Sequence, residues 1–138
     1  MLLSLSDLLD IDEIGTADDF PSDNVGHPNL LESYSRTAHL DPMNNLFVFD
    51  IYGTKPHMYV QGVFPTITAA RASAKGYFLS SLMRFTKHSE LARMMGMNPQ
   101  KLNWQDISKR QQGLMLGNSI VVPVGCRVVH SLLRALGR

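Results

Sequence analysis

The stretch Arg84–Gly96, "RFTKHSELARMMG", is where the pattern of the chain changes from strand to helix. Aromatic residues are dense up to Phe85 and then become sparse. The apolar residues that follow have helical spacing and share one face: Leu91, Met94 and Met95. Gly96 is typical of the residue that ends a helix, so this stretch predicts a helix closed at Gly96.

The charged residues of the same stretch allow two interpretations. Glu90 and Arg93 either organise the local structure or form an i, i+3 surface ion pair worth roughly a few tenths of a kcal/mol. The basic side chains form either a modest basic patch or, as the more common case, a solvated face. The residues of this patch are Arg84, Lys87, His88 and Arg93.

Strands are expected on the N-terminal side of this stretch. Residues 45–52, "NLFVFDIY", and 57–64, "HMYVQGVF", are rich in aromatic and β-branched residues and are separated by a Gly-Thr-Lys-Pro turn, which predicts a hairpin. Residues 65–79 predict a strand-like start, a loop of small residues and a short strand.

The first forty residues carry weaker signals. Residues 4–10, "SLSDLLD", predict a short helix with Ser4 or Ser6 as its N-cap. Residues 11–29 are acidic and rich in Gly, Pro, Asp and Asn, which is typical of a surface loop or linker. Residues 30–40 are weakly helical in pattern.

Two helices are expected after Gly96. Residues 98–106 form a turn-rich connection, and 108–116 open with Ser108 and Gln111 at the spacing of a capping box. A final helix over about 120–136 has so wide an apolar face that we expect it to be largely buried.

The junction before the final helix reads Gly117-Asn118-Ser119. Asn118 or Ser119 is a suitable N-cap after a glycine turn, and Pro123 then falls in the first turn, where a missing N–H costs little. In the functional interpretation, free N–H groups and the positive end of the helix dipole face an anionic group of a ligand.

Composition sets broad limits on function. The chain has 138 residues, enough for one domain, with 44% hydrophobic and 18% charged residues. A net charge of +1 argues against a strongly basic nucleic-acid-binding protein but allows a local basic face. The single cysteine, Cys126, excludes an internal disulfide and favours a reducing compartment.

Other site types find little support in the sequence. The start of the chain lacks a basic segment and carries early Asp residues, unlike a signal peptide, and the absence of an 18-residue apolar run predicts no membrane partner. The five histidines show no ligand spacing, so we expect no metal site. Cys126 is expected to be a small buried hydrophobe and Trp104 a packing residue.

Three separated stretches, in this order, resemble the DNA cytosine-5 methyltransferases. Pro65–Ala69, followed by Tyr77–Leu79, resembles the return from the target-recognition region of that family. Arg84–Gly96 resembles the ninth motif, and "GLMLGNSIVVPV" resembles the tenth, with its Gly-Asn-Ser and following helix. Residues 4–10 are similar to the short segment after the eighth motif. The ninth-motif matches are Arg84, Glu90, Ala92, Arg93 and Gly96.

The resemblance implies a fold and a division of the chain. The fold would be α/β, namely the C-terminal portion of a Rossmann-like S-adenosylmethionine-dependent methyltransferase, with a small β-rich recognition segment followed by helices. Residues 1–63 would be a partial recognition region with the acidic loop and hairpin. Residues 64–138 would be the C-terminal methyltransferase segment.

The resemblance also implies site residues. Asn118 and Ser119 would approach the methionine end of S-adenosylmethionine, while Thr66, Thr68 and Arg84 would contact DNA. Glu90, Arg93 and Gly96 would be structural organisers. The family's Thr-Pro-Arg before the glutamate is replaced here by Lys87-His88-Ser89.

Essential motifs of the family are missing from the sequence. There is no Pro-Cys for the nucleophile, no Glu-Asn-Val and no glycine-rich cofactor loop, so this chain supplies no catalytic residue. We therefore expect an inactive C-terminal fragment or small subunit, whose partners are DNA and a chain or N-terminal region carrying motifs I–VIII. Two alternatives remain, a non-catalytic module that binds DNA or a methyltransferase, and an unrelated small α/β domain.

Overall fold

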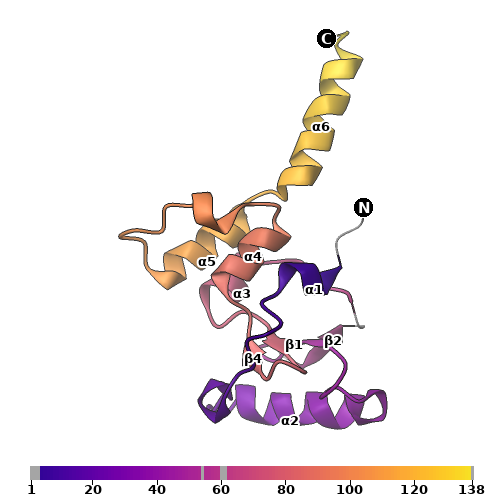
Figure 1. Ribbon diagram of the computed structural model, residues 1–138, viewed down its shortest axis with the longest axis vertical. Helices are drawn as coiled ribbons and strands as arrows, with labels where there is room; N and C mark the ends of the chain where they lie inside the picture. The colour runs from indigo at the N-terminus through magenta and orange to yellow at the C-terminus, as the bar shows by residue number, and fades with distance from the viewer. Residues whose placement is uncertain (1–3, 54, 60–61, 138) are drawn as a thin grey trace.

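The computed structural model describes residues 4–53, 55–59 and 62–137. Helices and strands alternate irregularly along the chain, and three short 3-10 helices (η) join them (Figure 1). The elements, in order, are α1 (Leu5–Leu8), η1 (Ala17–Asp19), α2 (Gly26–Thr37), η2 (Ala38–Leu40), β1 (Val48–Asp50), β2 (His57–Tyr59), α3 (Ala69–Ser73), β3 (Phe78–Leu79), β4 (Arg84–Phe85), α4 (His88–Met94), η3 (Pro99–Lys101), α5 (Lys109–Asn118) and α6 (Val122–Ala135).

A small antiparallel sheet with the strand order β2-β1-β3-β4 forms the centre of the fold. The predicted hairpin is confirmed where β1 pairs with β2, from Val48 opposite Tyr59 to Asp50 opposite His57. Residues 54, 60 and 61 of the predicted hairpin lie outside the described residues. The short strand β3 is confirmed as well. The predicted strand-like start at 65 and the small-residue loop are wrong, because those residues lead into α3, whose first turn is capped by Thr68.

The expected boundary between residues 63 and 64 does not separate two units. Strand β1 comes from the first segment and β3 from the second, yet they pair directly, with Val48 opposite Leu79. One sheet therefore crosses the expected boundary. All described strand pairs are antiparallel, whereas a Rossmann-like sheet is mostly parallel. The Rossmann-like sheet therefore stays a prediction, and it would have to lie in a larger assembly.

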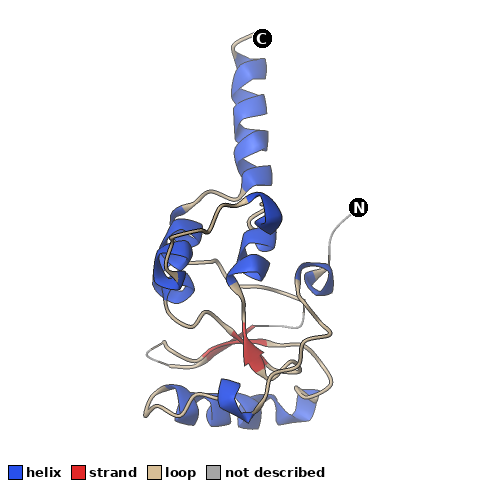
Figure 2. Cartoon of the chain, turned by 60° about the vertical axis from the view of Figure 1, so that its left-hand side comes forward, coloured by secondary structure: helices blue, strands red, loops and turns tan. Residues whose placement is uncertain are grey.

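Side chains of β1 and its neighbours alternate between two cores. On one face the strand residues pack against α2, which lies below the sheet in Figures 1 and 2. This core consists of Leu30, Phe47, Phe49, Ile51 and Phe78. Such alternation follows from the two-residue period of a strand.

Helix α2 is longer than the sequence predicts. It begins at Gly26, inside the stretch that we expected to be a loop. The Oδ1 atom of Asp23 accepts hydrogen bonds from the backbone N–H groups of Val25 and Gly26, at 3.1 and 2.6 Å. An Asp side chain that satisfies free N–H groups at a helix start stabilises that start, which explains the early beginning of α2.

The other face of the sheet is covered by α1, α3, α4 and α5 (Figure 2). Its core includes Val48 and Leu79 from the strands and Leu91 and Ala92 from α4. The predicted helices α1, α4 and α5 are thus confirmed, including the capping box between Ser108 and Gln111 at the start of α5.

Close packing of α5 on α3 depends on two glycines. A Cβ atom on Gly113 would lie 1.9 Å from the carbonyl oxygen of Ala72, and one on Gly117 would lie 2.2 Å from the backbone nitrogen of Ala69. Gly117 was expected in a turn before a helix, which is wrong, because it lies inside α5 where the backbones of two helices touch.

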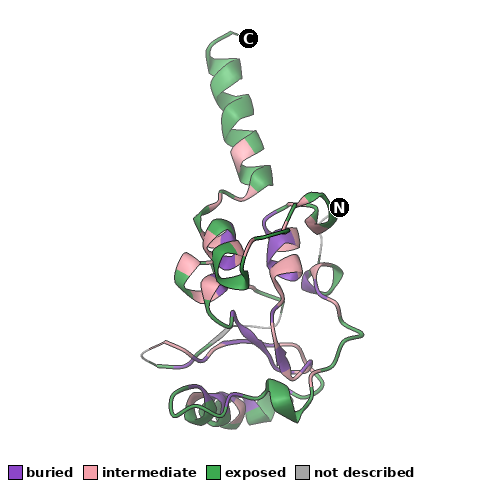
Figure 3. Cartoon of the chain, turned by 90° about the vertical axis from the view of Figure 1, so that its left-hand side faces the viewer, coloured by how far each residue is buried: buried purple, intermediate pink, exposed green. Residues whose placement is uncertain are grey.

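Helix α6 extends away from the rest of the molecule (Figures 1 and 3). The sequence predicts a largely buried helix, and this is wrong, because no residue of α6 is buried. Cys126, expected to be buried, is also exposed. Large apolar side chains are left in solvent, namely Val124, Val128, Val129, Leu132 and Leu133.

The polar residues of α6 lie on the opposite side. At 100° per residue, Arg127, His130 and Arg134 cluster on one face, and the apolar residues fill roughly half of the helix surface. An exposed apolar face of this size marks an interaction surface.

The segment Lys109–Ala135 is long and apolar enough to cross a membrane, by length and composition alone. In the structure this segment is two helices, broken between Asn118 and Val122. Helix α5 packs on α3, and the 14 residues of α6 span only about 21 Å, shorter than the roughly 30 Å of a hydrocarbon core. The break therefore disfavours one continuous spanning helix.

The glycine contact between α3 and α5 leads to a test. Gly117→Ala should lower the free energy of unfolding by about 1–3 kcal/mol, because its methyl group meets backbone atoms that cannot rotate away. Gly125→Ala is the matched control, since its nearest neighbour would be a methyl group of Ile120 at 3.5 Å. Urea unfolding followed by circular dichroism measures both, and equal stability of the two variants would contradict the packing argument.

Candidate functional site

A buried ion pair joins β4 to α4. The guanidinium of Arg84 and the carboxylate of Glu90 meet at 2.7 Å, with 7% and 0% of their side chains exposed. Glu90 Oε1 also accepts the backbone N–H of Asp10 at 2.9 Å, and Oε2 accepts that of Lys87 at 2.7 Å. Both carboxylate oxygens therefore have two donors each, which is what a buried charge requires.

Arg84 uses all five of its N–H groups inside the protein. Two go to Glu90, and three go to the backbone carbonyl oxygens of Asp10, Glu13 and Phe85. The resemblance implies that Arg84 contacts DNA, but a side chain with this burial and no spare donor is not placed to do so. We therefore assign Arg84 to the structural organisers.

Arg93 ties the same N-terminal segment to the end of α4. Its Nε atom donates to the carbonyl oxygen of Leu8 at 2.8 Å, and an Nη atom donates to Asp10 Oδ1 at 2.6 Å. Glu90 and Arg93 thus have different partners and do not pair with each other. The predicted surface ion pair is therefore wrong, and the contacts favour the organiser interpretation.

The carboxyl group of Asp10 is affected by this arrangement. Partial burial raises its pKa, but the hydrogen bond from Arg93 and the charges of Arg93 and Lys87 outweigh burial, so the pKa is lowered overall. In Arg84, burial lowers the pKa and the bond to Glu90 more than compensates. Both groups are thereby held in their charged forms.

Gly96 ends α4, as its position in the sequence predicts. It has a φ of +76°, and its N–H donates to the carbonyl oxygen of Arg93 at 2.9 Å. A Cβ atom there would lie 2.5 Å from Pro123 of α6. Next to it, the N–H of Val122 donates to the carbonyl oxygen of Met95 at 2.9 Å. The end of α4 therefore fixes the start of α6.

The junction around Asn118 differs from the predicted helix cap. Asn118 is the last residue of α5, and Ser119 is its C-cap, with Oγ donating to the carbonyl oxygen of Leu116 at 2.7 Å. Helix α6 begins only at Val122, with no side-chain cap. The predicted N-cap is thus wrong, because the glycine contact with α3 extends α5 through these residues.

The first N–H groups inside α6, where an anion site was predicted, are already hydrogen-bonded. The N–H of Val122 is bonded to Met95, and those of Val124 and Gly125 both donate to the carbonyl oxygen of Val121. Pro123 has no N–H. The first turn of α6 therefore offers a ligand no unused N–H group between Val122 and Gly125.

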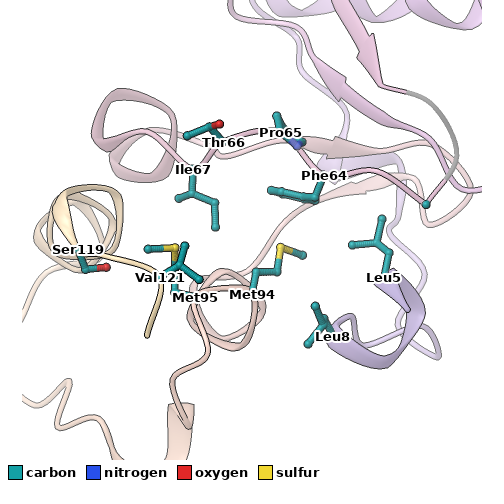
Figure 4. A pocket seen from close by; sticks show the side chains of 11 residues that line it. Leu5, Leu8, Phe64, Pro65, Thr66, Ile67, Met94, Met95, Ser119 and Val121 are labelled. Atoms are coloured by element: carbon teal, nitrogen blue, oxygen red, sulfur yellow. The ribbon is translucent and has the colours of Figure 1, made fainter. Parts of the chain in front are cut away.

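A cavity of about 390 Å³ lies beside this junction (Figure 4). Its walls come from α1, the segment before α3, the end of α4 and the junction between α5 and α6. Apolar side chains dominate, and the hydroxyl-bearing residues are Thr66 and Ser119. The lining side chains in Figure 4 are Leu5, Leu8, Phe64, Pro65, Thr66, Ile67, Met94, Met95, Ser119 and Val121.

The predicted site residues are only partly brought together. Ser119 and Thr66 line the same cavity, whereas Asn118 is exposed and outside its lining. Thr66 and Thr68 are both exposed, and they share a second hollow beside Asp50 and Arg71. Thr68 Oγ1 already caps α3, which leaves its O–H free to donate to a ligand.

Other predictions have mixed outcomes. Trp104 is half-buried against the main core, which confirms its packing role. No group of His, Cys, Asp and Glu in the described ranges could hold a metal ion. The sequence reasoning missed Asp10 and Glu13 as partners of the ninth-motif residues. Their only signal was an acidic segment opposite a basic one, which does not specify a pairing.

Comparison of the chain with protein-family models, curated proteins and solved structures gave no match. The family is therefore a proposal that rests on the chain's own residues.

The buried pair predicts a large effect of a small change. Glu90→Gln should lower the free energy of unfolding by about 3–5 kcal/mol, because it leaves the guanidinium of Arg84 buried without a counter-charge. The control is Glu32→Gln, which removes an exposed i, i+4 pair with Arg36 worth only about 0.3–0.5 kcal/mol. Chemical denaturation measures both, and similar losses would argue against a buried organising pair.

Asp10 predicts a dependence of stability on pH. Its pKa is lower in the folded state than the unfolded value of about 3.9, so its contribution is present above that value and is lost as the pH falls through the folded pKa. Asp10→Asn should reduce stability at neutral pH and flatten the decline between about pH 5 and pH 3. Thermal melts across this pH range compare Asp10→Asn with the charge-matched variant Asp12→Asn. Parallel stability profiles for the two variants would exclude a stabilising role of the Asp10 carboxylate.

Proposed function

We propose that this chain is the C-terminal portion, as a fragment or small subunit, of a DNA (cytosine-5) methyltransferase. The observation that carries the proposal is the convergence of the resembling stretches on one cavity. Leu5 comes from the stretch after the eighth motif, Thr66 from the return of the recognition region, Met94 from the ninth motif and Ser119 from the tenth.

This convergence adds information that the sequence alone lacks. The four stretches are separated by tens of residues, and a chance match of each would give no reason for them to meet. The roles of the matched residues are also consistent with the proposal, since Arg84, Glu90 and Arg93 hold the ninth-motif helix in place.

The proposed reaction is methyl transfer to C5 of cytosine in DNA. S-adenosylmethionine supplies the methyl group when it is bound, and the partner chain supplies the cysteine nucleophile, the glutamate and most of the cofactor pocket. This chain contributes one wall, which includes the hydroxyl group of Ser119, and the neighbouring Asn118 has an exposed side chain next in the sequence. Thr66 and Thr68 offer hydroxyl groups suited to a DNA phosphate.

Helix α6 supports a partner of this kind. Its apolar half is uncovered in the isolated chain, beginning at Val122 and continuing through Leu132 and Leu133. A helix with an apolar stripe this wide packs against a sheet in α/β domains. We propose that the catalytic chain provides that sheet.

Reconstitution tests the proposal directly. The chain should be mixed or coexpressed with a candidate chain that carries Pro-Cys and Glu-Asn-Val, and transfer of radiolabelled methyl groups to DNA should be measured. Activity is expected only in the mixture, because the nucleophile and the remaining site lie on different chains. Methyl transfer by this chain alone would overturn the proposal.

A double variant then tests the two polar residues at the junction. Ser119→Ala and Asn118→Ala, combined in the reconstituted enzyme, should weaken binding of S-adenosylmethionine, with Cys126→Ala as a control on the exposed helix. Unchanged cofactor affinity would remove both residues from the site. Stable binding of DNA or a methyltransferase without any methyl transfer would instead favour the non-catalytic module.

A further inference from the structure

Another hollow, of about 460 Å³ and distinct from the two described above, lies between the starts of α4 and α5. Basic and neutral polar residues line it, and none of the lining residues in the described part of the chain is acidic. The side chains that matter are those of Lys75, Lys87, His88, Ser89, Lys109 and Gln112.

This hollow divides the basic patch that the sequence suggested. Arg84 and Arg93 are occupied with the N-terminal segment, whereas Lys87 and His88 line the hollow together with lysines from two other segments. Lys87-His88-Ser89 is also the place where the chain departs from the ninth motif of the methyltransferases. Lys75 and Lys109 lie outside the stretch that resembles the ninth motif, so the resemblance does not account for the whole basic surface.

The start of α5 has an unfavourable charge distribution. Lys109 and Arg110 occupy its first two positions, and the first turn contains no acidic residue to offset them. Cations at a helix N-terminus oppose the helix dipole. Sequences that break such a helix-capping preference without an offsetting acidic residue are typical of binding sites. At the start of α5, a bound anion would offset the two positive charges.

The three lysines differ in how far they are already paired. Lys75 lies 3.5 Å from Asp23 with more than half of its side chain exposed, and an exposed pair of this kind is worth little. Lys87 pairs with Glu13 and Asp10. Lys109 has no acidic partner among the residues that the structure describes, so it is the cation most available to a ligand.

We propose that this hollow binds phosphate groups of a DNA backbone. The lysines come from three segments, and Lys75 and Lys109 are exposed while Lys87 is half-buried. Each carries a compact point charge without the rigid fork of donors that an arginine offers a single anion. That arrangement suits sequence-independent contact with a polyanion. The hollow is at the opposite end of α5 from Ser119, about 15 Å away along the helix.

Binding of a labelled DNA duplex by the full chain, followed by fluorescence anisotropy over a series of salt concentrations, tests the site. Lys109→Glu should weaken binding roughly fivefold to tenfold and reduce the salt slope by about 1, as expected for one phosphate contact. Lys101→Glu is the control with the same change in charge, because Lys101 lies in η3, outside the hollow, and should lose far less affinity.

Thermal stability separates binding from folding. Lys109→Glu should have a melting temperature no lower than that of the parent chain, because an acidic residue at this position suits the helix dipole. Weaker DNA binding with undiminished stability supports the site. Equal effects of Lys109→Glu and Lys101→Glu, or no effect of either, would overturn it.

Binding of pyrophosphate distinguishes a site for small anions from a site for the DNA backbone. If pyrophosphate shifts the NMR signals of Lys109 and Gln112 while the duplex does not bind, the hollow is a small-anion site and the proposal fails. The choice of DNA as the polyanion rests on the proposed function. The measurement needs neither the partner chain nor the cofactor, so its outcome is independent of the methyl-transfer test.

Discussion

The guanidinium of Arg84 and the carboxylate of Glu90 are buried together, and the rest of the structure is arranged around them. Removing two charges from water costs several kcal/mol per ion, and only a complete set of hydrogen bonds compensates. The remaining partners are backbone groups of Asp10, Glu13, Phe85 and Lys87. Satisfying this one pair therefore fixes the N-terminal segment, β4 and the start of α4 at the same time.

A second constraint acts at the other side of α4. Gly113 and Gly117 allow the backbones of α3 and α5 to touch, and Gly96 allows Pro123 to pack against the end of α4. These contacts bring the segment before α3, the end of α4 and the junction after α5 around a single cavity. The same contacts direct α6 away from the body, so its apolar half is left without a partner in this chain.

The sequence predicted elements whose signals are local. The hairpin, the helix ending at Gly96 and the capped start at Ser108 depend on residues within one turn or one strand of each other, and all three are present. Predictions that depended on distant partners were less successful. The apolar pattern of α6 correctly indicated an amphipathic helix, but pattern alone cannot show whether the covering surface belongs to the same chain.

In the candidate site, too, some features follow from the sequence and others only from distant contacts. By itself, the sequence determined the residue types along α4 and the apolar face of α6, and it suggested the proposed resemblance to the cytosine-5 methyltransferases. Only the tertiary structure decided that Glu90 pairs with Arg84, that Arg93 binds the segment around Asp10, and that Gly117 is a packing glycine and not part of a cap. The reason is physical, because a charge or a glycine acquires its role from the groups brought against it, and those groups lie tens of residues away in the sequence.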